Sequence, residues 1–156
     1  MKRKIVKTFE MLDWNCDQDT QAKGIALARQ INDLSVFLQP MEHGGKAVWD
    51  NCAKILAEKP DEDLEPLLES LLEWVRDINW PGAFIILNRL KNFSPELLRE
   101  SLQLSIQRAI KNKDNAWLDY LSELLDNPRL PKHLSENCLT ILQEHYHNWG
   151  GQPTGQ

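Results

Sequence analysis

Apolar residues recur at helical spacing along most of this chain. Leu67, Leu71, Trp74 and Ile78, for example, lie three or four residues apart and so share one face of a helix. β-branched residues are few, and no segment alternates apolar and polar residues as a half-buried strand does. The pattern therefore predicts an all-α fold. The expected helices span residues 2–13, 18–32, 45–58, 66–77, 80–92, 95–112, 115–126 and 131–148.

Residues that favour helix starts support several of these boundaries. Ser94 is followed by Pro95, and proline suits the first helical position because the N–H it lacks would be unpaired there anyway. Asp114 can cap the helix over 115–126, since its carboxylate can accept from the first free backbone N–H groups. Asn79 is placed to cap the helix over 80–92 in the same way, with Pro81 in its first turn.

The connections between the expected helices are short, which favours antiparallel neighbours. Leu12-Asp13-Trp14 is also similar to Leu72-Glu73-Trp74, a faint internal repeat at irregular spacing. We therefore expect stacked antiparallel helical hairpins resembling HEAT repeats, with a compact orthogonal helical bundle as the alternative. A single helical domain is expected over 1–149. Residues 150–156 contain no core-forming side chain and are expected to form a flexible C-terminal tail.

Composition and charge narrow the class of protein. The chain has 156 residues, of which 42% are hydrophobic, and a net charge of −5. Its acidic balance disfavours nucleic acid as the main ligand, because phosphate neutralisation supplies most of that affinity. No apolar run approaches the ~20 residues that a membrane-spanning helix needs. Three widely separated cysteines are typical of reduced thiols, so we expect a cytoplasmic protein. From the charge and the missing apolar run, we expect it to bind neither nucleic acid nor membrane.

Motifs for catalysis, metal binding and cofactor binding are missing. The chain has no nucleophile elbow, and Gly44-Gly45-Lys46 lacks the spacing of a phosphate-binding loop. His145 and His147 would point about 200° apart on a helix and could not share one ion. The cysteines are interpreted as small buried apolar residues, Cys52 above all. No catalytic residue, metal site or cofactor is therefore expected.

Residues 71–83, which we call the tryptophan corner, contain the most geometrically demanding sequence. Trp74 is expected in the core, and Trp74, Asp77, Asn79, Trp80 and Pro81 together are interpreted as a structural signature. Asp77 is expected to close the turn by accepting backbone N–H groups, or to pair with Arg76 or Arg89. The alternative is that Asp77 acts as a general base in a cleft.

An acidic run leads into this corner from Asp61. We call its members Glu62, Asp63, Glu65, Glu69 and Glu73 the acidic surface. Carboxylates at the start of a helix are favoured by the helix dipole, whereas Glu69 and Glu73, four residues apart, should repel each other. A like-charged ridge kept despite this repulsion would suit a basic partner. The alternative is an ordinary solvated face.

One stretch resembles a known family. Trp49-Asp50-Asn51-Cys52-Ala53-Lys54-Ile55-Leu56, then Asp61-Glu62-Asp63-Leu64-Glu65-Pro66, then Leu71-Leu72-Glu73-Trp74 with Asp77, Asn79, Trp80 and Pro81, is similar to an uncharacterised bacterial family. Its signature is Leu-Leu-Glu-Trp followed by Asp-x-Asn-Trp-Pro. The resemblance implies a small, all-helical, HEAT-like cytoplasmic protein, and some relatives resemble immunity proteins of toxin systems. It supplies no catalytic residues.

These observations together favour a non-enzymatic protein-binding module. The most concrete form of the hypothesis is an immunity protein that neutralises a bacterial polymorphic toxin by occluding its active surface, with a basic toxin domain as the partner. Two alternatives stay open. One is a helical-repeat enzyme that acts on a nucleobase, with Asp77 and Trp80 in a pocket. The other is a general helical scaffold.

Overall fold

A computed structural model describes residues 2–147, and within this range the chain forms helices and turns without any strand. The all-α prediction is confirmed. The α-helices are α1 (Lys2–Met11), α2 (Gln18–Ala28), α3 (Trp49–Ala57), α4 (Asp61–Leu64), α5 (Leu68–Trp74), α6 (Ala83–Lys91), α7 (Pro95–Lys111), α8 (Asn115–Ser122) and α9 (Glu136–His145). Short 3-10 helices are η1 (Leu34–Phe37), η2 (Gly45–Val48), η3 (Glu65–Leu67), η4 (Glu123–Asp126) and η5 (Pro131–His133).

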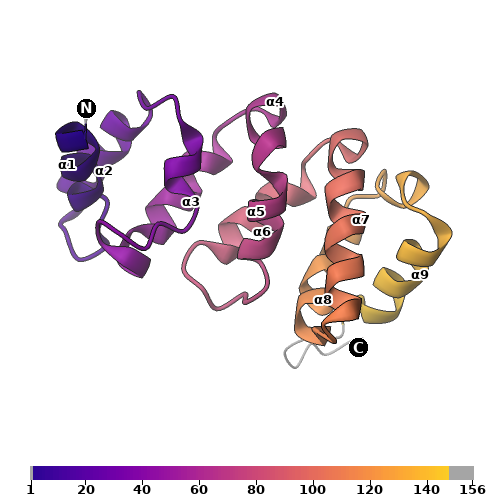
Figure 1. Ribbon diagram of the computed structural model, residues 1–156. Coiled ribbons are helices and arrows are strands. Elements are labelled where there is room, and N and C mark those ends of the chain that lie inside the picture. The colour runs from indigo at the N-terminus through magenta and orange to yellow at the C-terminus, as the bar shows by residue number, and fades with distance from the viewer. Residues whose placement is uncertain (1, 148–156) are drawn as a thin grey trace.

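The helices follow one another in chain order along an elongated array, with α1 and α2 at one end and α9 near the other (Figure 1). α1 packs on α2, α3 on α6, α5 on α7, and α8 on both α7 and α9. These contacts join helices that lie close to one another along the array. The closer likeness to HEAT repeats stays a prediction, as does the single-domain boundary at residue 149. The predicted tail at 150–156 lies outside the described residues.

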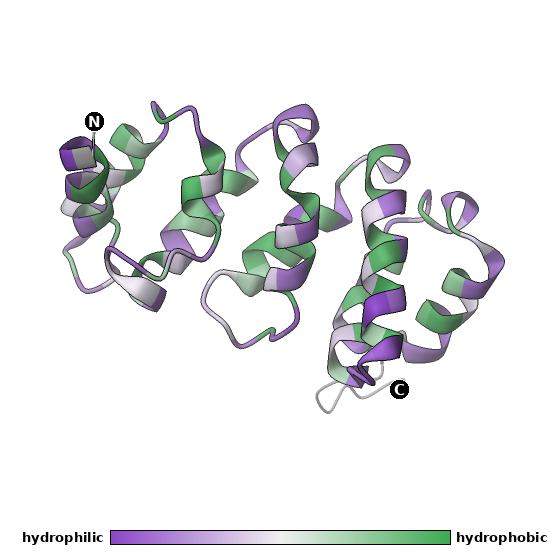
Figure 2. Ribbon diagram, viewed as in Figure 1, coloured by the Kyte–Doolittle hydropathy of each residue, from purple (hydrophilic) through white to green (hydrophobic). Residues whose placement is uncertain are grey.

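Apolar and polar residues both occur along most helices (Figure 2), and most of the large apolar residues are buried. One buried cluster runs from Phe9 in α1 through Trp74 in α5 to Leu142 in α9. A buried polar residue links α3 to the segment that contains α1 and α2. The side-chain amide of Asn51 in α3 donates to the carbonyl oxygen of Leu12 at 2.8 Å and to the side-chain oxygen of Gln21 at 2.9 Å. No helix within residues 2–147 has the length and apolar character needed to cross a bilayer.

Several helix starts agree with the sequence. α7 begins at Pro95, although Ser94 caps it without a side-chain hydrogen bond. Asp114 caps α8, and its carboxylate accepts from the backbone N–H of Trp117 at 3.1 Å. The cap at Asp114 is therefore confirmed, and the local residue chemistry was enough to predict it.

The predicted start of α6 is wrong. Asn79 does not cap a helix, and Pro81 does not lie in a first turn, because α6 begins only at Ala83. Gly82 occupies the cap position with φ of +84°, a left-handed conformation that glycine adopts without strain. The chain therefore completes a separate turn over Asp77–Pro81 before the helix can start.

Other predicted helices are shorter than expected because their ends tighten into 3-10 turns. The helix expected over 18–32 ends at Ala28, where Gln30 and Ile31 donate to carbonyl groups three residues back. The helix expected over 131–148 divides into η5 and α9, with Leu134 and Ser135 between them. The acidic run also forms its own short helix, α4, which the sequence pattern did not predict.

Candidate interaction surfaces

The tryptophan corner is a packed structural element. Trp74 is fully buried, and its indole Nε1–H donates to the carbonyl oxygen of Pro81 at 2.9 Å. The ring of Trp49 from α3 packs edge-to-face with two other tryptophans. Its centroid lies 6.2 Å from that of Trp74 and 6.1 Å from that of Trp80. This arrangement is the favourable one for aromatic quadrupoles. The facing of Trp80 could not be fixed from the sequence, and the structure places its ring against Trp49.

Asp77 closes the turn within this corner. Its carboxylate accepts from the backbone N–H of Asn79 at 2.9 Å, and its carbonyl oxygen accepts from that of Trp80 at 3.0 Å. The first bond is an Asx turn, in which a short carboxylate replaces a backbone acceptor. Arg76 and Arg89, the alternative partners, bind Asp114 and Asp61 instead. Of the two roles considered for Asp77, the structure therefore supports the turn.

The inner part of the acidic surface is paired with a cation. Arg108 from α7 donates to the carboxylate of Glu73 at 2.7 Å and lies 3.8 Å from that of Glu69. The repulsion expected between Glu69 and Glu73 is therefore relieved by a residue that is distant in sequence. Asp61, at the start of the acidic run, is likewise bound by Arg89 at 2.6 Å.

The outer carboxylates of the acidic surface, Glu62, Asp63 and Glu65, have a different environment. All three are exposed, and no described residue forms an ion pair with them. Glu62 and Asp63 line a pocket of about 520 Å³, which we call the acidic pocket. Its other walls are formed by Arg29, Ile31, Asn32, Asp33, Leu34, Ser35, Lys59, Pro66 and Leu67.

Charge in the acidic pocket is mainly negative. Arg29 is already paired, since its guanidinium donates twice to Glu58, at 2.9 and 2.8 Å. These hydrogen bonds raise the pKa of Arg29 and lower that of Glu58. Lys59 is the other cation in the lining, against the carboxylates of Asp33, Glu62 and Asp63. With apolar side chains such as Leu34 and Leu67 beside them, these carboxylates can receive the stem and charge of a lysine or arginine.

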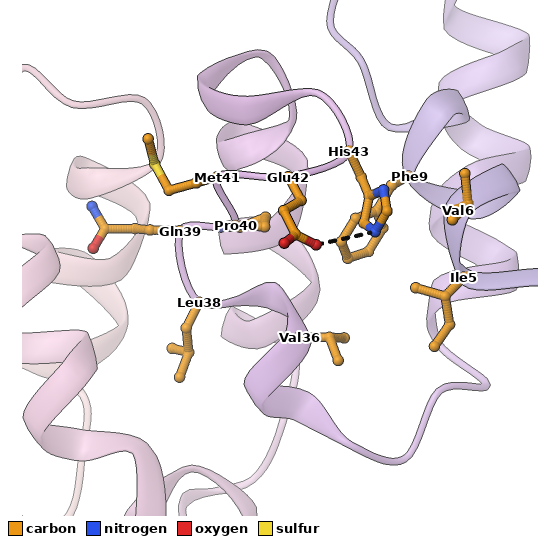
Figure 3. A pocket seen from close by; sticks show the side chains of 10 residues that line it. All are labelled: Ile5, Val6, Phe9, Val36, Leu38, Gln39, Pro40, Met41, Glu42 and His43. Carbon is orange, nitrogen blue, oxygen red and sulfur yellow. Dashed lines mark ion pairs between the residues drawn. The ribbon is translucent and has the colours of Figure 1, made fainter. Parts of the chain in front are cut away.

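A larger pocket lies at the N-terminal end of the array. We call it the N-terminal groove: it has a volume of about 640 Å³ and is lined by Ile5, Val6, Phe9, Val36, Leu38, Gln39, Pro40, Met41, Glu42 and His43. Figure 3 shows that the lining comes from two segments, α1 and residues 36–43, with the rings of Phe9 and His43 side by side. This groove was not predicted from the sequence. The run Val36-Phe37-Leu38, apolar but outside every expected helix, was the available signal.

Histidines and carboxylates near the C-terminal end form separate pairs. His145 lies 2.6 Å from Asp119, His147 lies 3.2 Å from Glu123, and Tyr146 hydrogen-bonds to Asp126. The last bond raises the pKa of Tyr146 to about 12. α9 ends at His145, so the expectation that His147 shares its helix is wrong. Within residues 2–147, no three His, Cys, Asp or Glu side chains are grouped to hold a metal ion.

Cys52 has an unreactive thiol in the core. Cys52 and Cys138 are buried, and burial raises the pKa of Cys52 to about 12. A thiol with so high a pKa carries almost no thiolate at neutral pH and is a poor nucleophile. The interpretation of Cys52 as an apolar core residue therefore agrees with its environment.

These features define an all-helical protein with a tightly packed corner and open pockets on its surface. The chain belongs to the family described as a domain of unknown function (DUF5071), whose model matches residues 48–150. The match includes the tryptophan corner and the acidic surface, and it begins after α1, α2 and residues 36–43. Comparison with curated proteins and with solved structures gave no match.

Proposed function

We propose that this protein is a non-enzymatic protein-binding module, and specifically an immunity protein that neutralises a bacterial polymorphic toxin by occluding its active surface. One observation carries the proposal: Glu62, Asp63 and Glu65 are exposed carboxylates without an ion-pair partner among the described residues, and two of them line the acidic pocket. Unpaired charge at the rim of an interface steers a partner of opposite charge and selects against other partners.

The expected partner is a basic toxin domain. A lysine or arginine from its surface would enter the acidic pocket, where Glu62 and Asp63 supply acceptors and Leu67 contacts the alkyl stem. Because a typical interface buries ~1,600 Å² in total, the contact would extend well beyond the pocket onto neighbouring helix faces. Affinity would still depend on a few central residues.

Growth rescue tests this proposal. The toxin encoded beside this gene would be expressed with the wild-type protein or with the triple variant Glu62→Lys, Asp63→Lys, Glu65→Lys. We expect the wild type to protect the cells and the triple variant to fail, at equal protein levels. The matched control is Glu96→Lys, Glu100→Lys, Glu144→Lys, which reverses three exposed acids elsewhere on the molecule and should still protect.

Two results would count against the proposal. Full protection by the triple variant would show that the acidic surface is not the binding site. A gene neighbourhood that encodes no toxin would remove the immunity role, and a pull-down that recovers several cellular partners would then favour the general scaffold. The nucleobase enzyme has less support, because the carboxylate of Asp77 is already bound to the Asn79 N–H.

A further inference from the structure

Two arginines bind carboxylates of the acidic run, and their ion pairs differ in exposure. Asp61 lies 2.6 Å from Arg89, and the two side chains are only 23% and 16% exposed. The same guanidinium nitrogen donates to the carbonyl oxygen of Lys59 at 2.8 Å. The second carboxylate oxygen of Asp61 accepts from the backbone N–H of Ser94 at 2.9 Å. This pair therefore belongs to the packed fold.

The ion pairs of Arg108 are open to solvent instead. They join α7 to α5, which pack against each other (Figure 1). The side chain of Arg108 is 47% exposed, and those of its partners Glu73 and Glu69 are 39% and 66% exposed. Within residues 2–147, Arg108 has no other ion-pair partner. A protein bound to this face would therefore meet Arg108 together with the two glutamates.

Arg108 changes how charge is distributed over the acidic surface. Two carboxylates and one guanidinium give the inner part, Glu69 and Glu73, a net charge of −1 in place of −2. The three outer carboxylates have no such partner among the described residues. Unneutralised negative charge is therefore concentrated on the outer part, and an approaching cation is steered there.

Arg108 also opposes binding at the inner part directly. A lysine or arginine of a partner, placed on Glu69 or Glu73, would lie next to a guanidinium of the same sign. In water, like charges held at contact distance lower an affinity by about fivefold. Repulsion of this kind is a common means by which a protein surface selects against unwanted partners.

We infer that Arg108 is a specificity-determining residue of the acidic surface: it covers the inner carboxylates and so directs a basic partner to the outer ones. The inference rests on the proposed function in one respect, since it takes the acidic surface as the binding site. It adds the rule by which the partner is selected. A partner whose cations match the outer carboxylates binds, and one whose cations need the inner pair is disfavoured.

Removal of Arg108 should extend the binding site, and amide NMR can measure this change. The probe is a hexa-arginine peptide blocked at both termini, titrated at low ionic strength, where surface charges are least screened. On the wild type, we expect the peptide to shift the amide signals of the outer carboxylate residues. On Arg108→Ala, it should also shift those of Glu69 and Glu73. It should bind this variant about threefold or more tightly, because a like charge is gone and two carboxylates are uncovered.

A second arginine on α7 provides the matched control. Arg99, nine residues before Arg108, points about 180° away from it on the helix and is exposed. None of the ion pairs among the described residues includes it. Arg99→Ala removes the same charge, so it should leave the Glu69 and Glu73 signals in place and the affinity within about twofold of the wild-type value.

Two further variants test whether the gain comes from the uncovered carboxylates. Arg108→Lys keeps the positive charge and should restore most of the wild-type behaviour. Arg108→Ala combined with Glu69→Gln and Glu73→Gln should lose the gain, since both side chains are then neutral. A purely structural role for Arg108 would produce no gain in affinity in the first place.

Several results would overturn the inference. These are equal affinity of the wild type and Arg108→Ala, an equal gain in Arg99→Ala, a gain that survives neutralisation of Glu69 and Glu73, or a peptide that moves no signal in either protein. Because the peptide assay needs no toxin, its failure differs from that of the proposed function. If the wild type protects cells and Arg108→Ala shows no gain, the inference alone is wrong. If Arg108→Ala gains the inner site and the wild type does not protect, the immunity role alone is wrong.

Discussion

The tryptophan corner and the acidic surface are encoded by neighbouring stretches of the chain, and they differ in how their polar groups are satisfied. In the corner, the Trp74 indole and the Asp77 carboxylate each bind a backbone group within the same turn. On the acidic surface, Glu69 and Glu73 share Arg108, whereas Glu62, Asp63 and Glu65 face solvent. The polar groups of the corner are satisfied by nearby backbone groups and so stabilise the fold. The outer carboxylates of the acidic surface face solvent and are available to bind a partner.

Because of this difference, mutations in the two regions should have different effects. Residues of the corner are hard to replace because a local geometry requires them, so mutations there should change stability. Residues of the outer acidic surface make no such contact, so mutations there should change binding and leave stability nearly unaltered. Variants of the two regions should therefore differ in which property they change.

Replacing Gly82 with alanine should be the most damaging change. A Cβ at this position would lie 2.8 Å from the Ala53 Cβ and the Trp49 carbonyl oxygen, in a backbone with φ of +84°. Strain and overpacking together should lower the free energy of unfolding by about 3 kcal/mol, measured by urea denaturation. Gly45→Ala is the control, because φ is also positive there but no atom lies within 4 Å. Equal losses at both sites would contradict close packing at the corner.

Trp74→Phe should have the next largest effect. The smaller ring leaves part of a buried site empty and removes the donor to the Pro81 carbonyl oxygen. We expect a loss of about 2 kcal/mol in the same denaturation experiment. Trp14→Phe, at a tryptophan that is 47% exposed, should change stability by less than about 0.5 kcal/mol. If the two variants were equally stable, Trp74 would not anchor the core as described.

Asp77→Ala should destabilise the protein by about 1 kcal/mol, because the Asn79 N–H loses its acceptor. Asp77→Asn should cost less, since an amide oxygen can still accept this hydrogen bond. Thermal unfolding of both variants measures the difference. A loss of enzymatic activity in Asp77→Asn without any change in melting temperature would instead favour a catalytic role.

Arg108→Ala should have the smallest effect on stability. Its ion pairs with Glu69 and Glu73 are exposed to solvent, and exposed pairs contribute about 0.5 kcal/mol. The stability difference between wild type and variant should shrink further as salt is added. A loss above about 2 kcal/mol would mean that the inner acidic surface belongs to the fold as firmly as the corner does.

The features of the fold that depend on residues close together in the chain could be predicted from the sequence. Helical spacing indicated the all-α class, and two helix starts were predicted correctly, from the cap at Asp114 and from the proline at position 95. The start of α6 was missed because Asn79 resembles a cap in sequence, and only the turn closed by Asp77 shows that Gly82 holds that position. Close approach of Gly82 to α3 depends on tertiary packing that no local pattern encodes.

The candidate sites were harder to predict for the same reason. The acidic residues were evident in the sequence, but the pairing of Glu73 with Arg108 joins positions 35 residues apart. The N-terminal groove brings α1 together with residues 36–43, and it forms only when these segments pack. The charge and hydrophobicity of residues along the chain do not show which distant residues will contact one another after folding.

One measurement tests the central division most directly: calorimetric titration of two variants with the basic toxin domain that the proposed function requires as partner. This division predicts that Glu62→Lys, Asp63→Lys, Glu65→Lys loses affinity by about 100-fold or more and stays folded at the assay temperature, with only a small fall in melting temperature from the charges reversed at the start of α4. It predicts that Asp77→Ala melts at a lower temperature and, while folded, binds as the wild type does. Unchanged affinity of the triple variant, or lost affinity of folded Asp77→Ala, would contradict the account.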